Sequence, residues 1–291
     1  MIQLICKCCG GNLKLNPGRT LGRCEYCDSE YIIENRKDAT MNIIKAVTPE
    51  PENEKGRTKC AEYYTEEGRL LKINYLYLSQ NNYRSMYVTE NNVIFVYPRE
   101  KAYMADSYIN HVCRIKYPDE EMKRKSHYYL PCFENKYKLM SGAVMVVIKK
   151  LKWTYPISLA GKPGDIHAAW IISRLEHLAC LFEYNEMSPS HIDMNDIFFD
   201  PRNHQVMVYG GWEHVENKAI NFLRYIRCIG THLMNDKDTV RPALEAFLTS
   251  SPKSDAIEDF GYWDKTIDKA FGKRSFAVWN VTEKEIYERM V

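Results

Sequence analysis

Residues 188–212 read SPSHIDMNDIFFDPRNHQVMVYGGW, and this stretch decides the fold. Two apolar triplets, IFF at 197–199 and VMV at 206–208, lie on either side of a polar turn that contains Pro201. Paired apolar runs around a turn are typical of two short buried strands. Polar residues flank the triplets: Asp196 precedes the first and Tyr209 follows the second.

Length and composition bound the class of protein. The chain has 291 residues, with 27% charged and 12% aromatic residues and a formal net charge of +2. Such a chain can hold one large domain with a small appendage, and its charge does not indicate nucleic acid, an anionic membrane or an acidic substrate. The longest apolar stretch, 143–148, is too short to cross a bilayer, and no signal peptide pattern follows Met1. We therefore expect a cytoplasmic protein without a membrane partner.

Two C-x-x-C pairs near the amino terminus predict a metal site. Cys6 and Cys9 form the first pair, Cys24 and Cys27 form the second, and fourteen residues separate the pairs. Each pair can direct two thiolates at one ion, so that together they complete a tetrahedral zinc site with four cysteine ligands. Cys8 is an alternative to Cys6 or Cys9, although the spacing favours Cys6 with Cys9. Four thiolates leave no position for water, which predicts a structural Zn²⁺ that supplies the folding energy of this small module.

A zinc ribbon can also bind nucleic acid, so its charge matters. Residues 1–34 carry four basic and four acidic side chains, and four thiolates around zinc add negative charge. The ribbon therefore lacks the positive excess that phosphate backbones select. This balance favours docking to a protein partner, or to the rest of the chain, over nucleic-acid binding.

The rest of the chain divides into a linker and a main domain. Residues 1–35 are assigned to the ribbon, 36–66 to a linker and 67–291 to the main domain, because 48–56 is polar, contains Pro and Gly, and has no periodicity. Alternating apolar residues predict strands over 70–77, 86–88 and 93–97, and two more strands within 138–148. Apolar residues at helical spacing predict helices through 105–116, 165–184 and 219–233, and a capping box at 282–285 begins a last helix.

Three strands, a helix, two strands, a linker and then helices is the order of a protein kinase, and residues 188–212 resemble the catalytic loop and metal-binding turn of that fold. More narrowly, DPRNH at 200–204 and FGKRSF at 271–276 are similar to the HPENH and YGKRKFHPF segments of compact kinase-like proteins from phages and bacteria. The resemblance covers about residues 67–280. It implies an α+β fold, in which the zinc ribbon precedes a bilobal protein-kinase-like domain with a β-rich N-lobe at 67–152 and a helical C-lobe at 153–291.

The resemblance also implies which catalytic groups are missing. When the apolar triplets are aligned, Asp196 takes the place of the metal-binding asparagine, His191 that of the catalytic aspartate and Tyr209 that of the metal-binding aspartate. An alternative register uses Asp193 as the catalytic base, but it requires a two-residue deletion before the strand. Kinase catalysis depends on charge neutralisation around the phosphates, so the loss of the metal-holding carboxylate removes much of the transition-state stabilisation.

The predicted N-lobe has lost further groups. The turn at 79–85 contains no glycine, so its backbone cannot readily approach a triphosphate. The third strand offers Val96 or Tyr97 where kinases carry a lysine, and Lys101 comes after the strand has ended. Asp106 of the next helix then has no strand lysine to pair with, and we interpret it as a solvated helix residue.

The segment after Gly211 is also short. Only seven residues, 212–218, separate Gly211 from the next predicted helix. Kinases use a much longer segment there, which carries the activation site and the platform for a peptide substrate. Seven residues can cross the gap but cannot do both.

Together these features favour a catalytically inactive kinase-like protein, a pseudokinase, that acts as a scaffold or regulatory binding protein for a protein partner. In this hypothesis the chain has no catalytic residue, does not use ATP and Mg²⁺, and holds only the structural zinc at Cys6, Cys9, Cys24 and Cys27. The alternative is an atypical nucleotide-binding phosphotransferase that uses Asp193 or Asp196. A weaker alternative is a nucleic-acid-associated zinc-ribbon protein.

Overall fold

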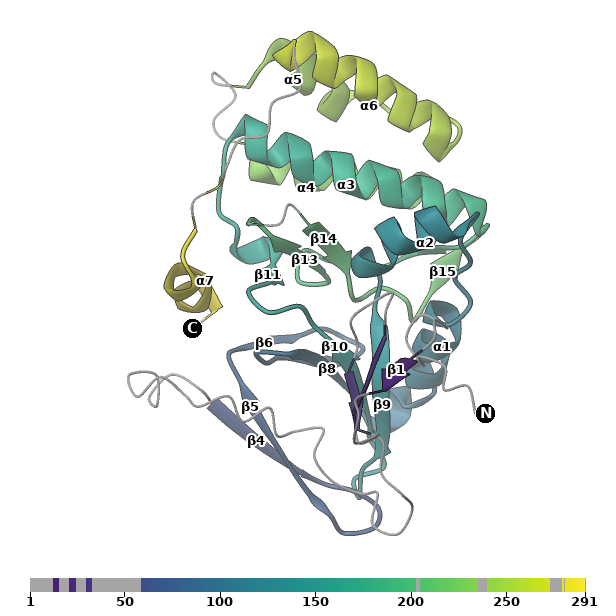
Figure 1. Cartoon of the computed structure of the whole chain (residues 1–291), viewed down its shortest axis with the longest axis vertical. Coiled ribbons are helices and arrows are strands. Elements are labelled where there is room, and N and C mark those ends of the chain that lie inside the picture. Colours follow the sequence, from purple (N-terminus) through teal and green to yellow (C-terminus); the bar gives the residue numbers. More distant parts are fainter. Residues whose placement is uncertain are drawn as a thin grey trace. The chain divides into compact units, whose positions relative to one another are not determined.

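The computed structural model describes residues 59–202, 205–234, 240–272, 279 and 281–290, together with three strands nearer the amino terminus. The chain, drawn in Figure 1, forms two compact units. The first unit runs to Ala105 and continues over Glu120–Lys152, and the second contains Asp106–Asp119 and Trp153–Met290. Among the described helices, none combines the length and the apolar composition that crossing a bilayer requires.

A five-stranded antiparallel sheet lies at the centre of the first unit, in the order β6-β7-β8-β10-β9. Its strands are β6 (Tyr77–Gln80), β7 (Ser85–Val88), β8 (Asn92–Tyr97), β9 (Cys132–Lys138) and β10 (Val144–Lys149). Between β8 and β9 the chain forms the 3-10 helices η1 (Arg99–Lys101) and η2 (His127–Tyr129) and the helices α1 (Tyr103–Val112) and α2 (Glu120–Ser126). The predicted order of three strands, a helix and two strands is confirmed, with α2 as an addition. The bounds of the last two strands are not, because β9 ends at Lys138, where the predicted range of 138–148 begins.

A separate hairpin of β4 (Lys59–Tyr64) and β5 (Leu70–Tyr75) covers one face of this sheet. Leu71 and Ile73 of β5 are buried against Ile94 and Val96 of β8. Alternate residues of a strand point to the same face, which is why the apolar positions two apart form one continuous layer. The buried cluster consists of Leu71, Ile73, Tyr87, Ile94, Val96, Leu139, Ala143, Met145 and Val147.

The structure also corrects two other boundaries in this unit and adds one helix. Residues 59–64 form β4, although the sequence analysis places them in the 36–66 linker. This strand was missed because only Ala61 and Tyr63 turn toward the core, and so short an alternation of apolar residues is not recognisable in the sequence. The strand predicted over 70–77 is interrupted at Leu76, whose N–H donates to the Val88 carbonyl at 2.8 Å. Helix α2 was not predicted because its sequence, EEMKRKS, has no apolar stripe.

Helices dominate the second unit. They are α3 (Asp165–Tyr184), α4 (Ile220–Leu233), α5 (Pro242–Thr249), α6 (Ala256–Phe271) and α7 (Glu283–Met290). Helix α3 packs against α4 and α6, and α5 packs against α6 (Figure 1). The predicted bounds of α3 are confirmed, and so is the capping box, in which Thr282 and Glu285 exchange hydrogen bonds of 2.7 and 3.3 Å between side chain and backbone.

Short antiparallel strands complete the second unit. They are β11 (Tyr155–Pro156), β12 (Ser188–Pro189), β13 (Ile197–Asp200), β14 (Gln205–Val208) and β15 (Val215–Glu216), and the 3-10 helix η3 (Ile157–Leu159) follows β11. The two apolar triplets form β13 and β14, which pair with Ile197 opposite Val208, and both triplets are fully buried. The chain is thus an α+β protein with a strand-rich first unit and a helical second unit.

Candidate functional site

The residues beside the two triplets meet at the base of the β13–β14 hairpin. The backbone N–H groups of Tyr209 and Gly210 both donate to the Asp196 carbonyl, at 2.8 and 3.3 Å. Asp196 is 1% exposed and Tyr209 is 2% exposed. The Tyr209 ring lies edge-on to Phe198, with 4.9 Å between ring centroids. Two of the residues that the sequence singles out are therefore brought together, inside the protein.

Residues 193–196, here called the acidic loop, are closed by their own carboxylates. The Asp193 N–H donates to Asp196 Oδ2 at 3.1 Å, and the Asn195 N–H donates to Asp193 Oδ1 at 2.6 Å. The Asp196 N–H donates to the Asp193 carbonyl at 3.0 Å. Aspartate side chains that accept backbone N–H groups in this way stabilise tight turns. One oxygen of each carboxylate is thus occupied by the backbone of the loop.

Two neighbouring elements contact the acidic loop. The Ser158 hydroxyl of η3 donates to Asn195 Oδ1 at 2.6 Å. From α4, Tyr225 faces the loop: burial, and then the negative charges of Asp193 and Asp196, raise the pKa of Tyr225 above its ordinary value. Tyr225 is therefore a neutral phenol at physiological pH. No pattern in the sequence marks Ser158 or Tyr225, because both reach the loop from other elements.

His191, at the position of the catalytic aspartate, occupies a tight turn. Its backbone is left-handed, with a φ of 56°, a conformation in which histidine is one of the more common non-glycine residues. Its side chain is exposed, and its ring lies 5.1 Å from that of His214. The neighbouring Ser190 N–H donates to the carbonyls of His214 at 2.9 Å and Gly211 at 3.2 Å, which holds the turn in place.

Gly211 is required by its surroundings. Its φ is 81°, and a Cβ atom there would lie 2.5 Å from Ile192 Cγ1 and 3.0 Å from the Ser190 carbonyl. Only glycine combines this backbone conformation with so close an approach.

The seven-residue segment 212–218 is built into the second unit. Trp212 is fully buried, donates from Nε1 to the Val208 carbonyl at 3.0 Å and lies edge-on to Phe182 at 5.4 Å. Val215 and Glu216 form β15, which pairs with β12. The segment therefore serves packing and strand pairing, as expected for a short crossing.

Helix α1 makes three hydrogen bonds to backbone carbonyls after β14, two in this segment and one at Tyr209, a set that we call the α1 clamp. The Ser107 hydroxyl donates to the Glu213 carbonyl at 2.8 Å, and the Tyr108 hydroxyl donates to the Tyr209 carbonyl at 2.5 Å. His111 Nδ1 contacts the Trp212 carbonyl at 2.8 Å, which requires the Nδ1–H form of the ring. The α1 clamp fixes the chain directly after β14.

In the first unit, the turn between β6 and β7 is also closed on itself. Asn81 Oδ1 accepts from the N–H groups of Tyr83 at 2.9 Å and Arg84 at 3.0 Å. The Asn81 N–H donates to the Arg84 carbonyl at 3.1 Å. These are the N–H groups that a phosphate-binding turn would offer to its ligand.

The third strand of the sheet, β8, presents apolar side chains as predicted. Val96 is 8% exposed and Tyr97 is fully buried. The structure adds one cation that the sequence analysis missed: Arg84 is 5% exposed and its guanidinium lies 3.9 Å from the centroid of the Phe95 ring. Asp106 is exposed on α1.

The candidate zinc ligands lie mostly outside the described residues. Cys6, Cys9 and Cys27 belong to that undescribed part, and Cys24 is the last residue of β2 (Leu21–Cys24). With β1 (Leu13–Leu15) and β3 (Glu30–Ile32), β2 forms a three-stranded antiparallel sheet. Leu13 lies opposite Cys24, and Arg23 lies opposite Glu30. The start of β1, the end of β2 with Cys24, and the start of β3 are therefore at one end of this sheet.

Comparison with known proteins yields likenesses only among solved structures. No model of a protein family matches the chain, and no curated protein matches it. WbdD in complex with the kinase inhibitor LY294002 is 11% identical over 68% of this chain and 46% of that chain, with a TM-score of 0.46. A structure described as the bifunctional kinase-methyltransferase WbdD is 11% identical over 75% of this chain and 52% of that chain, with a TM-score of 0.45. Vaccinia related kinase 3 is 14% identical over 79% of this chain and 74% of that chain, with a TM-score of 0.41.

These likenesses are distant. The chain spans about half the length of the WbdD chains that it matches. TM-scores and identities this low do not by themselves establish a common fold. The chain is thus similar in part to solved kinase structures, and no family follows from that similarity.

Proposed function

We propose that this chain is a kinase-like protein that does not transfer phosphate and that acts as a scaffold or regulatory binding protein for a protein partner. The order of its elements supports the kinase-like fold: a five-stranded sheet has α1 between its third and fourth strands, and a helical unit with the β13–β14 hairpin follows. The observation that carries the proposal is the acidic loop, whose two carboxylates accept hydrogen bonds from the loop itself.

Magnesium chemistry explains why this loop matters. Mg²⁺ needs oxygen ligands in near-ideal octahedral geometry, and in kinases a carboxylate and an asparagine oxygen hold the ions against the phosphates. Asp196, at the asparagine position, instead accepts the Asp193 N–H through Oδ2. Tyr209 takes the position of the metal-binding aspartate, and its ring packs edge-on against Phe198. The α1 clamp holds the same backbone in this arrangement.

The β6–β7 turn supports the same conclusion on the nucleotide side. Its Tyr83 and Arg84 N–H groups donate to Asn81, and the strand that carries a lysine in kinases carries Val96 and Tyr97. Arg84 is a buried cation that a nucleotide-binding alternative would use, because its guanidinium lies on the sheet over Phe95.

We also propose that the amino-terminal module is a structural zinc ribbon. Cys6, Cys9, Cys24 and Cys27 would hold the ion with four thiolates. The antiparallel order of β1, β2 and β3 supports this, because it places the start of β1 at the same end of the sheet as Cys24. Bound zinc would fix the two turns relative to each other. Docking of this ribbon to a protein is favoured over nucleic acid by its balanced charge.

Thermal melting with ATP and MgCl₂ tests the absence of phosphotransfer. We expect the midpoint of the full chain to stay unchanged at millimolar nucleotide, and we expect no transfer of label from γ-labelled ATP to the chain or to casein. A ligand that binds only the folded state, present at a concentration of a hundred times its Kd, would add about 2.7 kcal/mol to the free energy of unfolding, which is readily detected.

Matched variants make the outcome decisive. Asp196→Asn keeps an oxygen for the Asp193 N–H but removes the charge that a metal needs, and Arg84→Gln removes the buried cation. A midpoint shift of several degrees that disappears in both variants, together with label transfer that they abolish, would replace the scaffold with the phosphotransferase alternative.

A further inference from the structure

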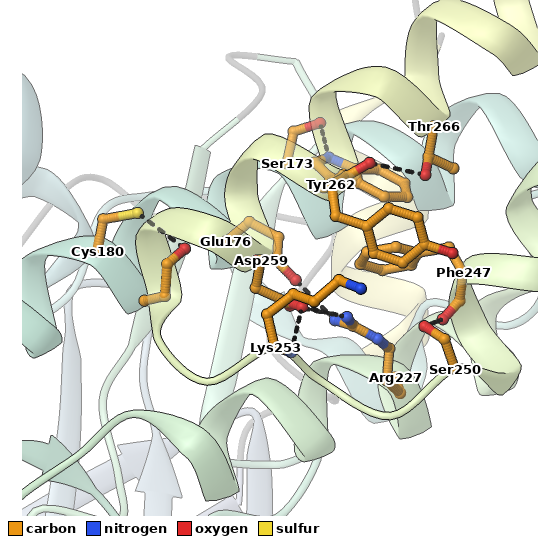
Figure 2. Close-up of polar contacts among 12 residues, drawn as sticks. Ser173, Glu176, Cys180, Arg227, Phe247, Ser250, Lys253, Asp259, Tyr262 and Thr266 are labelled. Atoms are coloured by element: carbon orange, nitrogen blue, oxygen red, sulfur yellow. Dashed lines mark hydrogen bonds and ion pairs between the residues drawn. The ribbon is translucent and has the colours of Figure 1, made fainter.

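A buried ionic cluster joins three helices of the second unit. Arg227 of α4 contacts Glu176 of α3 through Nη1 at 2.9 Å and Asp259 of α6 through Nη2 at 2.7 Å (Figure 2). Glu176 and Asp259 are fully buried and Arg227 is 5% exposed. We call these three residues the buried triad.

The charges of the buried triad do not balance if both carboxyl groups are ionised. One guanidinium neutralises one carboxylate, and a second uncompensated charge in a dry interior is strongly unfavourable. Within the described part of the chain, Glu176 Oε2 lacks a hydrogen-bond donor, whereas Asp259 Oδ2 lies 2.7 Å from Arg227 Nη2. Burial, the negative charge of Asp259 and a side-chain hydrogen bond to Asp259 all favour the protonated form of Glu176 and raise its pKa. Two carboxyl groups can share a hydrogen bond only if one of them carries a proton, so a single proton on Glu176 would satisfy that bond and remove the excess charge.

Among the described residues, the surrounding elements provide no second cation at this point. From α5, the Phe247 ring lies 3.6 Å from the Arg227 guanidinium. From the α5–α6 connection, Lys253 donates its backbone N–H to Asp259 Oδ1 at 2.9 Å, while its ammonium group lies 4.7 Å from the centroid of the Tyr262 ring. On α3 itself, Cys180 is one turn from Glu176, and burial raises the pKa of its thiol to about 12, so it is neutral.

Glu176 is the group that keeps the proton. Burial, followed by the charge of Asp259, raises the pKa of Glu176 from 4.5 to about 8, and Arg227 opposes this rise. Asp259 has the better acceptor environment, because both Arg227 and the Lys253 N–H donate to it.

We propose that the buried triad is a proton-dependent latch, in which a proton on Glu176, shared with Asp259, attaches the α5–α6 helix pair to α3 and α4, and its loss at alkaline pH loosens that pair. The latch goes beyond the proposed scaffold function and is independent of it. The folded state binds this proton more tightly than the unfolded chain does. Its contribution to stability is therefore complete below about pH 4.5 and is lost as the pH rises through about 8. Within that window, each pH unit shifts the opening equilibrium by up to about tenfold.

Hydrogen exchange followed by mass spectrometry tests the latch in the full chain. We expect protection factors of peptides from residues 242–271, corrected for the intrinsic pH dependence of exchange, to fall by up to about tenfold per pH unit between about pH 6 and 8 and to level off above. Glu176→Gln retains a donor for Asp259 but cannot titrate. In this variant, the corrected protection of the 242–271 peptides should therefore be independent of pH. Glu245→Gln, which alters an exposed carboxylate on α5, should follow the wild type.

Asp259→Asn provides a second route if Glu176→Gln does not fold, because it leaves Glu176 alone with Arg227 and should also abolish the slope. Wild-type protection that is constant over the same pH range would overturn the latch, whether or not either variant folds. An equal slope in the wild type and Glu176→Gln would do the same, since another group would then be responsible.

Discussion

At the scale of single residues, the polar groups of the acidic loop and the hairpin base support the backbone. Asp193 and Asp196 accept N–H groups of their own loop, and Gly211 allows the chain to pass Ile192 closely. A phosphate-transferring site needs such groups directed at a ligand. Here the same positions stabilise a turn, and this is the physical basis of the proposed loss of activity.

Gly211→Ala is expected to destabilise the chain by about 2 to 4 kcal/mol, because it adds a steric clash to an unfavourable backbone conformation. A Cβ atom would lie 2.5 Å from Ile192 Cγ1. Gly161→Ala is the matched control: its φ is 68°, but nothing lies within 4 Å of the new atom. Its cost should therefore be only about 1 kcal/mol, that of the backbone alone. Urea denaturation followed by circular dichroism measures both, and equal costs would mean that Ile192 yields to the new methyl group.

At the scale of elements, the spacing of apolar residues predicted those helices and strands that bury one face against the core. The bounds of α3 were predicted because Ile172, Leu175, Ala179 and Phe182 recur on its buried face, and the β13–β14 hairpin was predicted from its apolar triplets. The α1 clamp could not be predicted, because its acceptors are backbone carbonyls, which every residue provides and no letter of the sequence marks. The closure of the β6–β7 turn by Asn81 was partly visible, since asparagine is common in turns, but its two donors were not.

Tyr108→Phe tests the α1 clamp. It removes the hydroxyl that donates to the Tyr209 carbonyl and leaves that carbonyl without this donor in a buried place. We expect a loss of about 1 to 2 kcal/mol in the free energy of unfolding, measured by urea denaturation. Tyr103→Phe, on the same helix with the side chain 63% exposed, should change the stability by less than about 0.5 kcal/mol. If both variants matched the wild type, water would be replacing the hydroxyl and the clamp would contribute little.

At the scale of the whole molecule, long-range pairing limits what a single sequence can predict. Arg227 is 51 positions from Glu176 and 32 from Asp259, and nothing local to any of them indicates the other two. The zinc ribbon is the opposite case, because its evidence is the spacing of cysteines along the chain. The register of β1 and β2 adds that Leu13 lies opposite Cys24, so the start of β1 and the first residue of the second pair lie at the same end of the sheet.

Elemental analysis of the purified full chain tests this prediction: we expect one zinc ion per chain. Cys27→Ser should lose it, because three thiolates bind zinc more weakly than four and the two turns are then held less firmly. Cys60→Ser is the matched control, since Cys60 is an exposed cysteine of β4 that lies outside both pairs, and it should retain the ion.

Cys8→Ser distinguishes the possible ligand sets, because it should have no effect if Cys6 pairs with Cys9. Zinc that remained in a double Cys9→Ser, Cys27→Ser variant would place the ion elsewhere in the chain and remove the basis for a ribbon.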